Sequence, residues 1–392
     1  MVVMAVLGAA AFVENAHAGT AGESQPRQEP FASSAAEDVG RLLAPLLAKH
    51  DVPGMAAVAL TSEKLLAQGA AGVRRRGSPE QVTIGDKFHI GSCTKAITAT
   101  LCAILVDQGD LSWDTTIADV FAELGESIQP AYRSVTLEQL LAHRAGIPAE
   151  LPGGVLQLRL RTSPAKPAQA RHLLLRDVLA QEPSAEPGAK FIYSNAGYAI
   201  AGHMAETVAG KDWETLLREK IAAPLGMTSL GFGAPGTLGV VDQPRGHGPM
   251  GAPVEPGPLA DNPTAIGPAG TAHCAPGDWA RFAAAHLAGA RGKPTGLGLE
   301  RSAFEKLHAP AEGGPPKYAL GWMVVERNWA HGVALSHSGS NTLWYAVAWL
   351  APKRDFGVLV ACNRGGEEAL KACDEAASIL IRHSLEKAAK AE

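Results

Sequence analysis

Apolar residues follow two different spacings along this chain, and the changes between them divide it into three parts. Near the N-terminus, helical spacing over 36–49 leads into two short apolar runs, "GMAAVAL" and "LLAQGAAGV", that predict strands. From about 115 to 310 the pattern is mainly helical, with 231–270 so rich in Gly and Pro that it predicts irregular loop. Four strand patterns, "YALGWMVVE", "GVALSHSG", "LWYAVAWLAP" and "FGVLVACN", then precede an amphipathic helix over 367–388.

Strands at both ends with helices between them predict one antiparallel sheet assembled from the two termini. The first and last helices would cover this sheet, and the helical region would be an insert. On the last helix, Leu370, Cys373, Ala377 and Leu380 share one face, which we expect to be buried. The predicted fold class is therefore α/β, of the α+β kind, with a functional site expected in a cleft between the sheet and the insert.

A buried helix is predicted to begin within the stretch "IGSCTKAIT". Apolar residues recur at Ile97, Leu101, Ile104 and Leu105, which is helical spacing. The polar start of this helix would lie at Ser92, directly after a strand-like apolar approach.

The charge pattern shows no field that would attract a nucleic acid. The 392 residues carry a formal charge of −4 with both signs interspersed, and the one basic run, Arg74–Arg76, predicts a solvated hairpin turn. The five cysteines form no C-x-x-C pair, and the thirteen histidines form no compact ligand cluster. We therefore expect no metal, no cofactor and no nucleic-acid partner. Core packing is expected for Cys93, Cys102, Cys274, Cys362 and Cys373.

The first residues are typical of a signal for export. An apolar run over 2–13 is followed by "AHA" at 16–18, which is the A-x-A pattern of a signal-peptidase site. We therefore expect 1–18 to be a signal peptide and the protein to be periplasmic or secreted. The apolar run is too short to be a permanent membrane span.

The remaining sequence predicts a linker and one domain. Residues 19–34, rich in Gly, Ser, Glu, Pro and Gln, predict a flexible linker. Residues 35–388 would form a single domain. Its sheet subdomain would comprise about 35–115 and 310–388, and its helical subdomain about 116–309. The sequence leaves the oligomeric state open.

Ser92 and Lys95 form an S-x-x-K motif at the start of the predicted buried helix. Residues three apart lie on one helical face, so the lysine amine can reach the serine hydroxyl. A serine alcohol needs such a base, because the free hydroxyl is a weak nucleophile at neutral pH. A helix N-terminus adds backbone N–H groups that can stabilise an oxyanion. The motif also occurs at 163–166, beside prolines, and at 384–387, where solvated side chains are expected.

Two further polar elements give the first S-x-x-K motif its context. "YSN" at 193–195 is the only Y-x-N in the chain, and "HSGS" at 337–340 interrupts the end of a predicted strand. Each has an ordinary explanation by itself: a core tyrosine, an asparagine that caps a helix, and a polar residue at a strand end. We expect Cys93 to be a packing residue and His143 and Arg144 to have structural roles.

Taken in this order, the three elements resemble the active-site set of the penicillin-recognising serine hydrolases. The set is similar to that of the class C β-lactamases and of the D-alanyl-D-alanine carboxypeptidases and esterases that share their fold. The resemblance covers roughly 36–385. It includes "DVPGMAAVAL", "GDLSWDTTIADV", "VTLEQLLAHRAGIP", "PGAKFIYSNAGYAIAG", "PLGMTSLGFG", "GPAGTAHCAPGDWARFA" and "YALGWMV". It implies a β-lactamase/transpeptidase-like fold and an enzyme that works through an acyl-enzyme.

The resemblance implies a role for each residue of the set. Ser92 would attack the carbonyl, and Lys95 would assist its deprotonation. Tyr193 would be the base or a proton relay and would protonate the leaving group. The backbone N–H groups of Ser92 and Ser340 would form the oxyanion hole, and Asn195 would hold Lys95 and a substrate amide. Which of Lys95 and Tyr193 holds the proton at rest stays open.

The chain departs from the lactamase pattern at two positions. Lactamases of this type carry a lysine where this chain has His337, two residues before Gly339, whereas carboxypeptidases of the fold carry histidine. Histidine is only partly charged near neutral pH, so a substrate carboxylate should be bound more weakly, or in a pH-dependent way, by His337. Glu150 would stand where lactamases present a glutamine to the substrate amide.

Three functions follow from this set. The first is a serine hydrolase that opens β-lactams or cleaves D-alanyl peptides through an acyl-enzyme on Ser92. The second is a carboxylesterase on the same fold, favoured by the missing lysine at His337. The third is a penicillin-binding sensor whose acyl-enzyme is not hydrolysed. In each case the partner is a small molecule.

Overall fold

The computed structural model describes residues 36–149 and 165–391. One compact unit of the chain contains all of these residues. The predictions made for 1–18, 19–34 and Glu150 lie outside the described residues.

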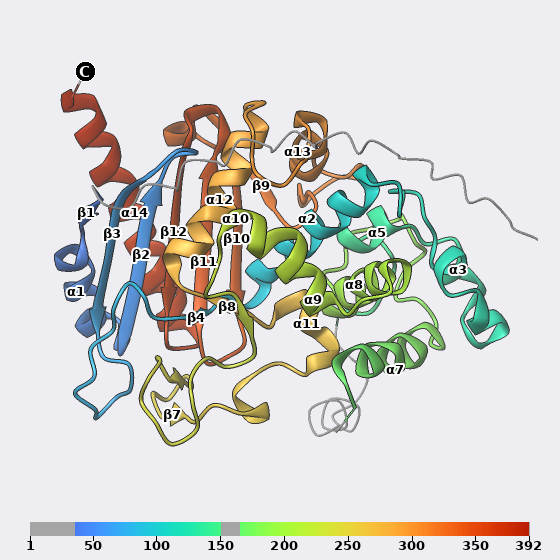
Figure 1. Cartoon of the computed structure of the whole chain (residues 1–392), viewed down its shortest axis with the longest axis horizontal. Coiled ribbons are helices and arrows are strands. Elements are labelled where there is room, and N and C mark those ends of the chain that lie inside the picture. The colour runs from blue at the N-terminus through green and yellow to red at the C-terminus, as the bar shows by residue number, and fades with distance from the viewer. Residues whose placement is uncertain (1–35, 150–164, 392) are drawn as a thin grey trace, which may run out of the picture. The chain divides into compact units, whose positions relative to one another are not determined.

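A seven-stranded sheet joins the two ends of the described chain (Figure 1). The strand order is β1-β3-β2-β12-β11-β10-β9, so β2 from the N-terminal part pairs directly with β12 from the C-terminal part. This confirms a sheet built from both termini. It is mixed rather than wholly antiparallel, because the short β1 runs parallel to β3. The strands are β1 (Glu37–Asp38), β2 (Gly54–Leu60), β3 (Leu65–Gly72), β9 (Met323–Arg327), β10 (Gly332–Ser340), β11 (Tyr345–Ala351) and β12 (Phe356–Cys362).

The central strands are buried on both faces, which explains why their sequences are continuously apolar. In β12, Val358 and Val360 point into the core on one side of the sheet, whereas Leu359 and Ala361 point into the core on the other side. Successive side chains of a strand alternate between faces, so only an apolar run satisfies two cores. Each buried valine or leucine contributes about 1.5–3 kcal/mol relative to an exposed one.

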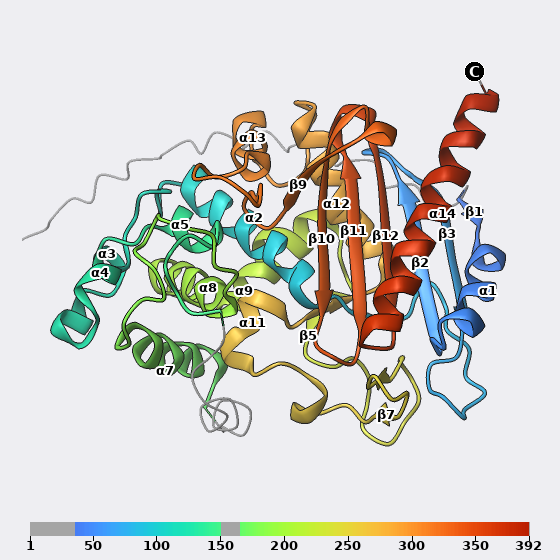
Figure 2. The ribbon, with the colours of Figure 1, turned by 180° about the vertical axis from the view of Figure 1, so that it is seen from behind.

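Helices cover both faces of the sheet. Helices α1 (Gly40–Lys49) and α14 (Glu367–Ala391) pack on one face, and α12 (Pro276–Ala290) packs on the other (Figure 2). The first helix begins later than predicted, because Glu37 and Asp38 pair with β3 instead.

The predicted buried face of the last helix is partly wrong. Leu370 is 47% exposed, whereas Cys373, Ala377 and Leu380 are buried as expected. The buried stripe starts from Ala369 instead, since small residues let the helix approach the sheet closely.

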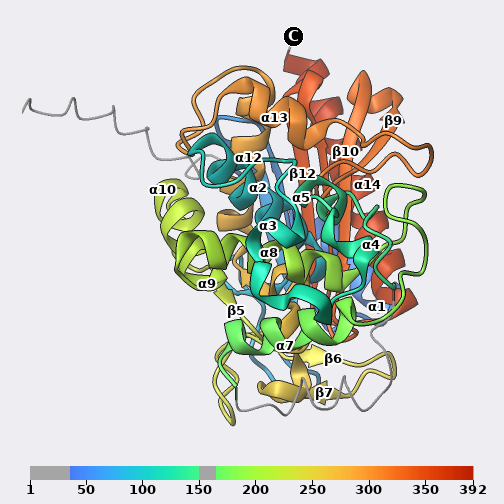
Figure 3. The same cartoon turned by 90° about the vertical axis from the view of Figure 1, so that its right-hand side faces the viewer.

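The middle of the chain is mainly helical, and apart from α12 most of its helices gather to one side of the sheet (Figures 1 and 3). They are α3 (Ile117–Val120), α4 (Pro130–Arg133), α5 (Leu137–Leu141), α7 (Pro167–Leu179), α8 (Asn195–Ala209), α9 (Trp213–Leu217), α10 (Ala223–Leu225), α11 (Gly267–Gly270) and α13 (Arg301–His308). Short strands pair within and beside the Gly- and Pro-rich segment: β4 (Phe88–His89), β5 (Gly231–Phe232), β6 (Gly246–His247), β7 (Pro253–Val254) and β8 (Ala272–Cys274). Among the described helices, none is long and apolar enough to cross a bilayer.

One buried helix connects the sheet to the insert. A 3-10 turn, Gly91–Cys93, leads into α2 (Thr94–Asp107), so Ser92 lies within this turn and is not a helix cap. The turn packs against the end of β10: a Cβ on Gly339 would lie 2.6 Å from Ser92 N and 2.8 Å from Cys93 N. Gly91 also has φ +50°, which few other residues adopt. Two glycines thus permit the backbones of the two segments to touch.

We expect Gly339→Ala to break this contact. The added methyl group would have to displace backbone atoms, so the free energy of unfolding should fall by about 1–3 kcal/mol or more. Gly277→Ala is the matched control, because the methyl group there meets open space at the start of α12 and should change stability by less than about 1 kcal/mol. Urea unfolding of both variants tests this, and equal midpoints would contradict it.

Candidate active site

The Ser92 hydroxyl and the Lys95 amine are in contact. Lys95 Nζ lies 3.0 Å from Ser92 Oγ, as the three-residue spacing predicts. The lysine side chain is fully buried, whereas Ser92 keeps part of its surface exposed. A reactant can therefore approach the serine while the amine stays away from water.

Two further acceptors fix the amine. Lys95 Nζ donates to Asn195 Oδ1 at 2.7 Å and to the carbonyl oxygen of Ala269 at 2.8 Å. None of its three partners is a carboxylate. Burial lowers the pKa of Lys95 well below its usual value. A neutral amine has two N–H groups and one lone pair, so the two carbonyl-type acceptors leave the lone pair for the hydroxyl of Ser92.

Tyr193 completes the group around the serine. Its ring centroid lies 4.8 Å from Lys95 Nζ, and the nearby side chain of Ser92 favours the ionised form of its hydroxyl. Burial raises the pKa of Tyr193 above its usual value. Burial therefore disfavours the charged form of each group, the phenolate of Tyr193 and the ammonium of Lys95.

Asn195 does not cap α8. Ser194 is the N-cap residue, and its Oγ accepts the N–H of Gly197 at 3.3 Å. The amide oxygen of Asn195 is thereby free to accept from Lys95, as the resemblance implied.

The backbone N–H groups of Ser92 and Ser340 come from segments that touch. A Cβ on Gly91 would lie 2.6 Å from the carbonyl carbon of Gly339, and Ser340 N is closer still. The Ser340 side chain turns away to donate to the carbonyl of Trp344 at 2.7 Å. This contact brings the backbone N–H of Ser340 close to the turn that contains Ser92.

His337 differs from its predicted state. It is 5% exposed, its Nδ1 donates to the carbonyl of Ser338 at 2.6 Å, and its Nε2 accepts the hydroxyl of Tyr318 at 3.1 Å. Burial lowers the pKa of His337 to about 3, with a further contribution from Lys95. The expected partial charge is absent near neutral pH, and both ring nitrogens are engaged within the protein.

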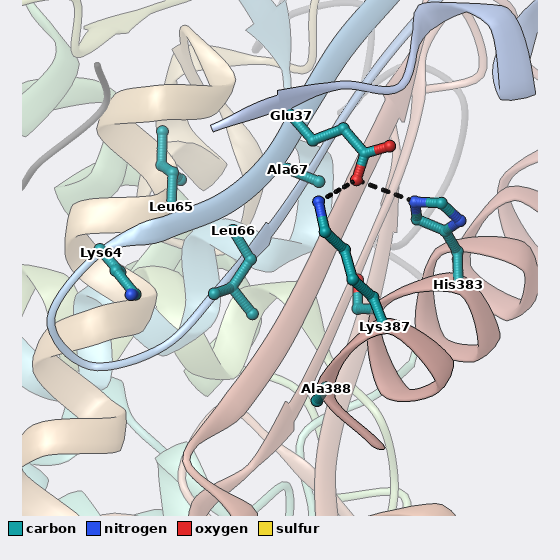
Figure 4. A pocket seen from close by; sticks show the side chains of 9 residues that line it. Glu37, Lys64, Leu65, Leu66, Ala67, His383, Lys387 and Ala388 are labelled. Atoms are coloured by element: carbon teal, nitrogen blue, oxygen red, sulfur yellow. Dashed lines mark hydrogen bonds and ion pairs between the residues drawn. The ribbon is translucent and has the colours of Figure 1, made fainter. Parts of the chain in front are cut away.

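The S-x-x-K match at 384–387 has different surroundings from those of Ser92 and Lys95. Lys387 Nζ donates to Glu37 Oε2 at 2.9 Å on the surface of the sheet, beside His383 (Figure 4). The Lys387 side chain is 66% exposed and forms an ion pair with the Glu37 carboxylate, whereas Lys95 is buried and has no carboxylate partner. Burial, rather than the motif itself, distinguishes the two lysines.

Cys93 has a packing role. Its thiol is buried and donates to the carbonyl of His337 at 3.4 Å. Burial raises the pKa of this thiol above its usual value, which keeps it from acting as a thiolate nucleophile. Within 36–149 and 165–391, no three His, Cys, Asp or Glu side chains are grouped so that they could hold a metal ion.

Several residues that shape the site were not predicted. Ala269 supplies the second carbonyl for Lys95, and His89 Nδ1 accepts the N–H of Gly91 at 3.1 Å while its Nε2 donates to Asp261 at 2.7 Å. The stretches "GPAGTAHCAPGDW" and "FHIGS" carried the only signal for them, because backbone acceptors and buried imidazoles leave no periodic pattern.

The comparisons with known proteins agree with this geometry. A model of the Beta-lactamase family matches residues 39–380. Penicillin-binding protein 4 of Amycolatopsis lactamdurans is 31% identical over 291 residues, which are 74% of this chain and 73% of that protein. The D-alanyl-D-alanine-carboxypeptidase/endopeptidase AmpH of Escherichia coli K12 is 27% identical over 52% of this chain and 51% of its own length. The structure of D-alanine carboxypeptidase AmpC from Burkholderia cenocepacia has a TM-score of 0.67 at 22% identity, covering 86% of this chain and 96% of that one.

We expect Asn195→Asp to protonate Lys95. A carboxylate in place of the amide favours the charged amine, so the pKa of Lys95 should rise. The rate at which a fluorophosphonate modifies Ser92 should then need a higher pH to reach its plateau than in the wild type. Asn195→Ala adds no charge, so it should not raise the pH at which the modification rate reaches its plateau. If the Asp and Ala variants share one pH profile, the electrostatic account of Lys95 is wrong.

Proposed function

Because the chain belongs to the beta-lactamase family of hydrolases, we propose that it is a serine hydrolase that forms an acyl-enzyme on Ser92. Its proposed substrates are amides of the D-alanyl peptide or β-lactam type. The observation that carries the proposal is the contact of Lys95, which is buried without a carboxylate partner, with the hydroxyl of Ser92.

The acylation step would use this pair directly. The hydroxyl of Ser92 passes its proton to the lone pair of Lys95 as Oγ bonds to the substrate carbonyl carbon. The carbonyl oxygen becomes an oxyanion that the N–H groups of Ser92 and Ser340 would hold. One such donor is worth about 3 kcal/mol in the transition state.

Tyr193 is placed to supply the proton of the leaving group. Burial raises its pKa, which favours the protonated phenol, and its ring lies 4.8 Å from Lys95 Nζ, next to the reacting serine. As the carbon–nitrogen bond breaks, the phenol would protonate the amine, and the protonated Lys95 would return a proton to the phenolate. The reverse relay would activate the water that hydrolyses the acyl-enzyme.

Two relatives support an amide substrate. A penicillin-binding protein and a D-alanyl-D-alanine-carboxypeptidase/endopeptidase are among the similar proteins, with 31% and 27% identity. The chain spans about half the length of the second, so its printed activity enters here as part of the proposal.

A carboxylesterase is the second candidate, and His337 favours it. The imidazole is neutral and hydrogen-bonded within the protein, so this position offers no fixed cation to a substrate carboxylate. An ester with an uncharged acyl group would not require one. A stable acyl-enzyme that is not hydrolysed would instead indicate a sensor.

Ser92→Ala should abolish acylation. We expect intact-protein mass spectrometry to show one adduct on the wild type after incubation with a penicillin or a butyrate ester, and none on this variant. Ser384→Ala removes the serine of the S-x-x-K match at 384–387, which is buried beside an exposed lysine, and should retain the adduct. An adduct that survives in Ser92→Ala would contradict the proposal. Relative turnover of a penicillin, a cephalosporin, a D-Ala-D-Ala peptide and the ester then separates the amide from the ester reading.

A further inference from the structure

His143 adopts an unusual backbone conformation directly beside the proposed site. It follows α5 with φ +58°, a region that non-glycine residues seldom adopt, and its side chain is 2% exposed. Such a conformation costs on the order of 1 kcal/mol or more and persists only where the surroundings hold it in place. Its hydrogen bonds show what it does there.

Two of these bonds enclose Tyr193. The N–H of Ile192, the preceding residue, donates to the carbonyl of His143 at 2.7 Å. The N–H of Ser194, the following residue, donates to His143 Nδ1 at 3.1 Å. The imidazole also packs on the tyrosine, with ring centroids 4.3 Å apart. One residue therefore fixes the backbone on both sides of Tyr193 and contacts its ring.

Filling this buried space with an imidazole carries a free-energy cost. Because Nδ1 accepts a hydrogen bond, the ring proton lies on Nε2, which is buried without a hydrogen-bond partner. An unpaired buried donor costs about 1–3 kcal/mol. The ring is enclosed by Phe191, Tyr198 and Tyr318, with centroids 4.8–5.5 Å away. A leucine would fill such an aromatic pocket without an unpaired donor, but it would not accept the N–H of Ser194.

We propose that His143 is a positioning residue for the reaction at Ser92, because it holds the backbone on both sides of Tyr193. The inference rests on the proposed function and adds a group that the reaction depends on without touching the substrate. His143 also helps to position Asn195 indirectly, since Asn195 follows Ser194 and is the first residue of α8. Loss of the Nδ1 acceptor would let the "YSN" turn shift against Ser92 and Lys95.

The test compares His143→Leu with His143→Asn. Leucine keeps the volume and removes the acceptor. Asparagine places Oδ1 near the position of Nδ1 and tolerates a positive φ. With p-nitrophenyl butyrate and a fluorophosphonate probe, His143→Leu should lower kcat and the rate of Ser92 modification by about 100-fold, with KM changed by less than about threefold. His143→Asn should recover most of both rates.

His247→Leu is the matched control. His247 is also a buried histidine that accepts a backbone N–H, from Arg76 at 3.0 Å, but its other ring nitrogen bonds to the carbonyl of Asn363. Its loss should lower the melting temperature and leave the modification rate of the folded protein near that of the wild type. If His143→Leu does not fold, His143→Gln replaces it, because its amide reaches the Nε2 position rather than that of Nδ1.

Each remaining outcome decides one question. If His143→Leu reacts at the wild-type rate, or folded His143→Asn is as slow as the variant without an acceptor, the positioning role is wrong. If the wild type itself is not modified at Ser92 and hydrolyses none of the substrates, the proposed function fails before the variants are compared.

Discussion

The complete burial of one amine is the constraint on which the site depends. Lys95 Nζ has no exposed surface, so the protein must satisfy it with its own atoms: the hydroxyl of Ser92, the amide of Asn195 and the carbonyl of Ala269. These partners come from three separate segments of the chain. The same burial that requires them also lowers the pKa of the amine, so its position and its basicity have one physical cause. The exposed Lys387 is paired with a carboxylate instead.

The fold was largely predictable because its signal is periodic. Apolar runs at both ends identified the strands of the sheet, and most of its internal pairs are antiparallel as expected. The exceptions are local. Glu37 and Asp38 pair with β3 through their backbone, which leaves no side-chain pattern, and Leu370 lies outside the buried stripe because alanines of α14 occupy it. Neither difference could be read from hydrophobicity alone.

The site was predictable in its members but not in its electrostatics. The three polar elements identified Ser92, Lys95 and Tyr193, and the structure brings these side chains together. Their protonation depends on how deeply each is buried, which one sequence does not show. For His337 the difference is largest, since a residue expected to face the substrate is turned toward Tyr318. Hydrogen bonds that involve backbone atoms, such as those between His143 and the N–H groups of Ile192 and Ser194, cannot be predicted from a sequence motif.

The pairing of β2 with β12 has a consequence for how the chain is made. Met55 pairs with Cys362, and Gly339 packs on the turn that carries Ser92, so the sheet and the site both need residues separated by most of the sequence. During synthesis, the hairpin of β2 and β3 has no β12 to pair with until the last strands leave the ribosome. Such long-range pairing slows folding and exposes an apolar strand edge meanwhile. Ser92 is therefore synthesised early, but the site around it can form only after the C-terminal strands have been made.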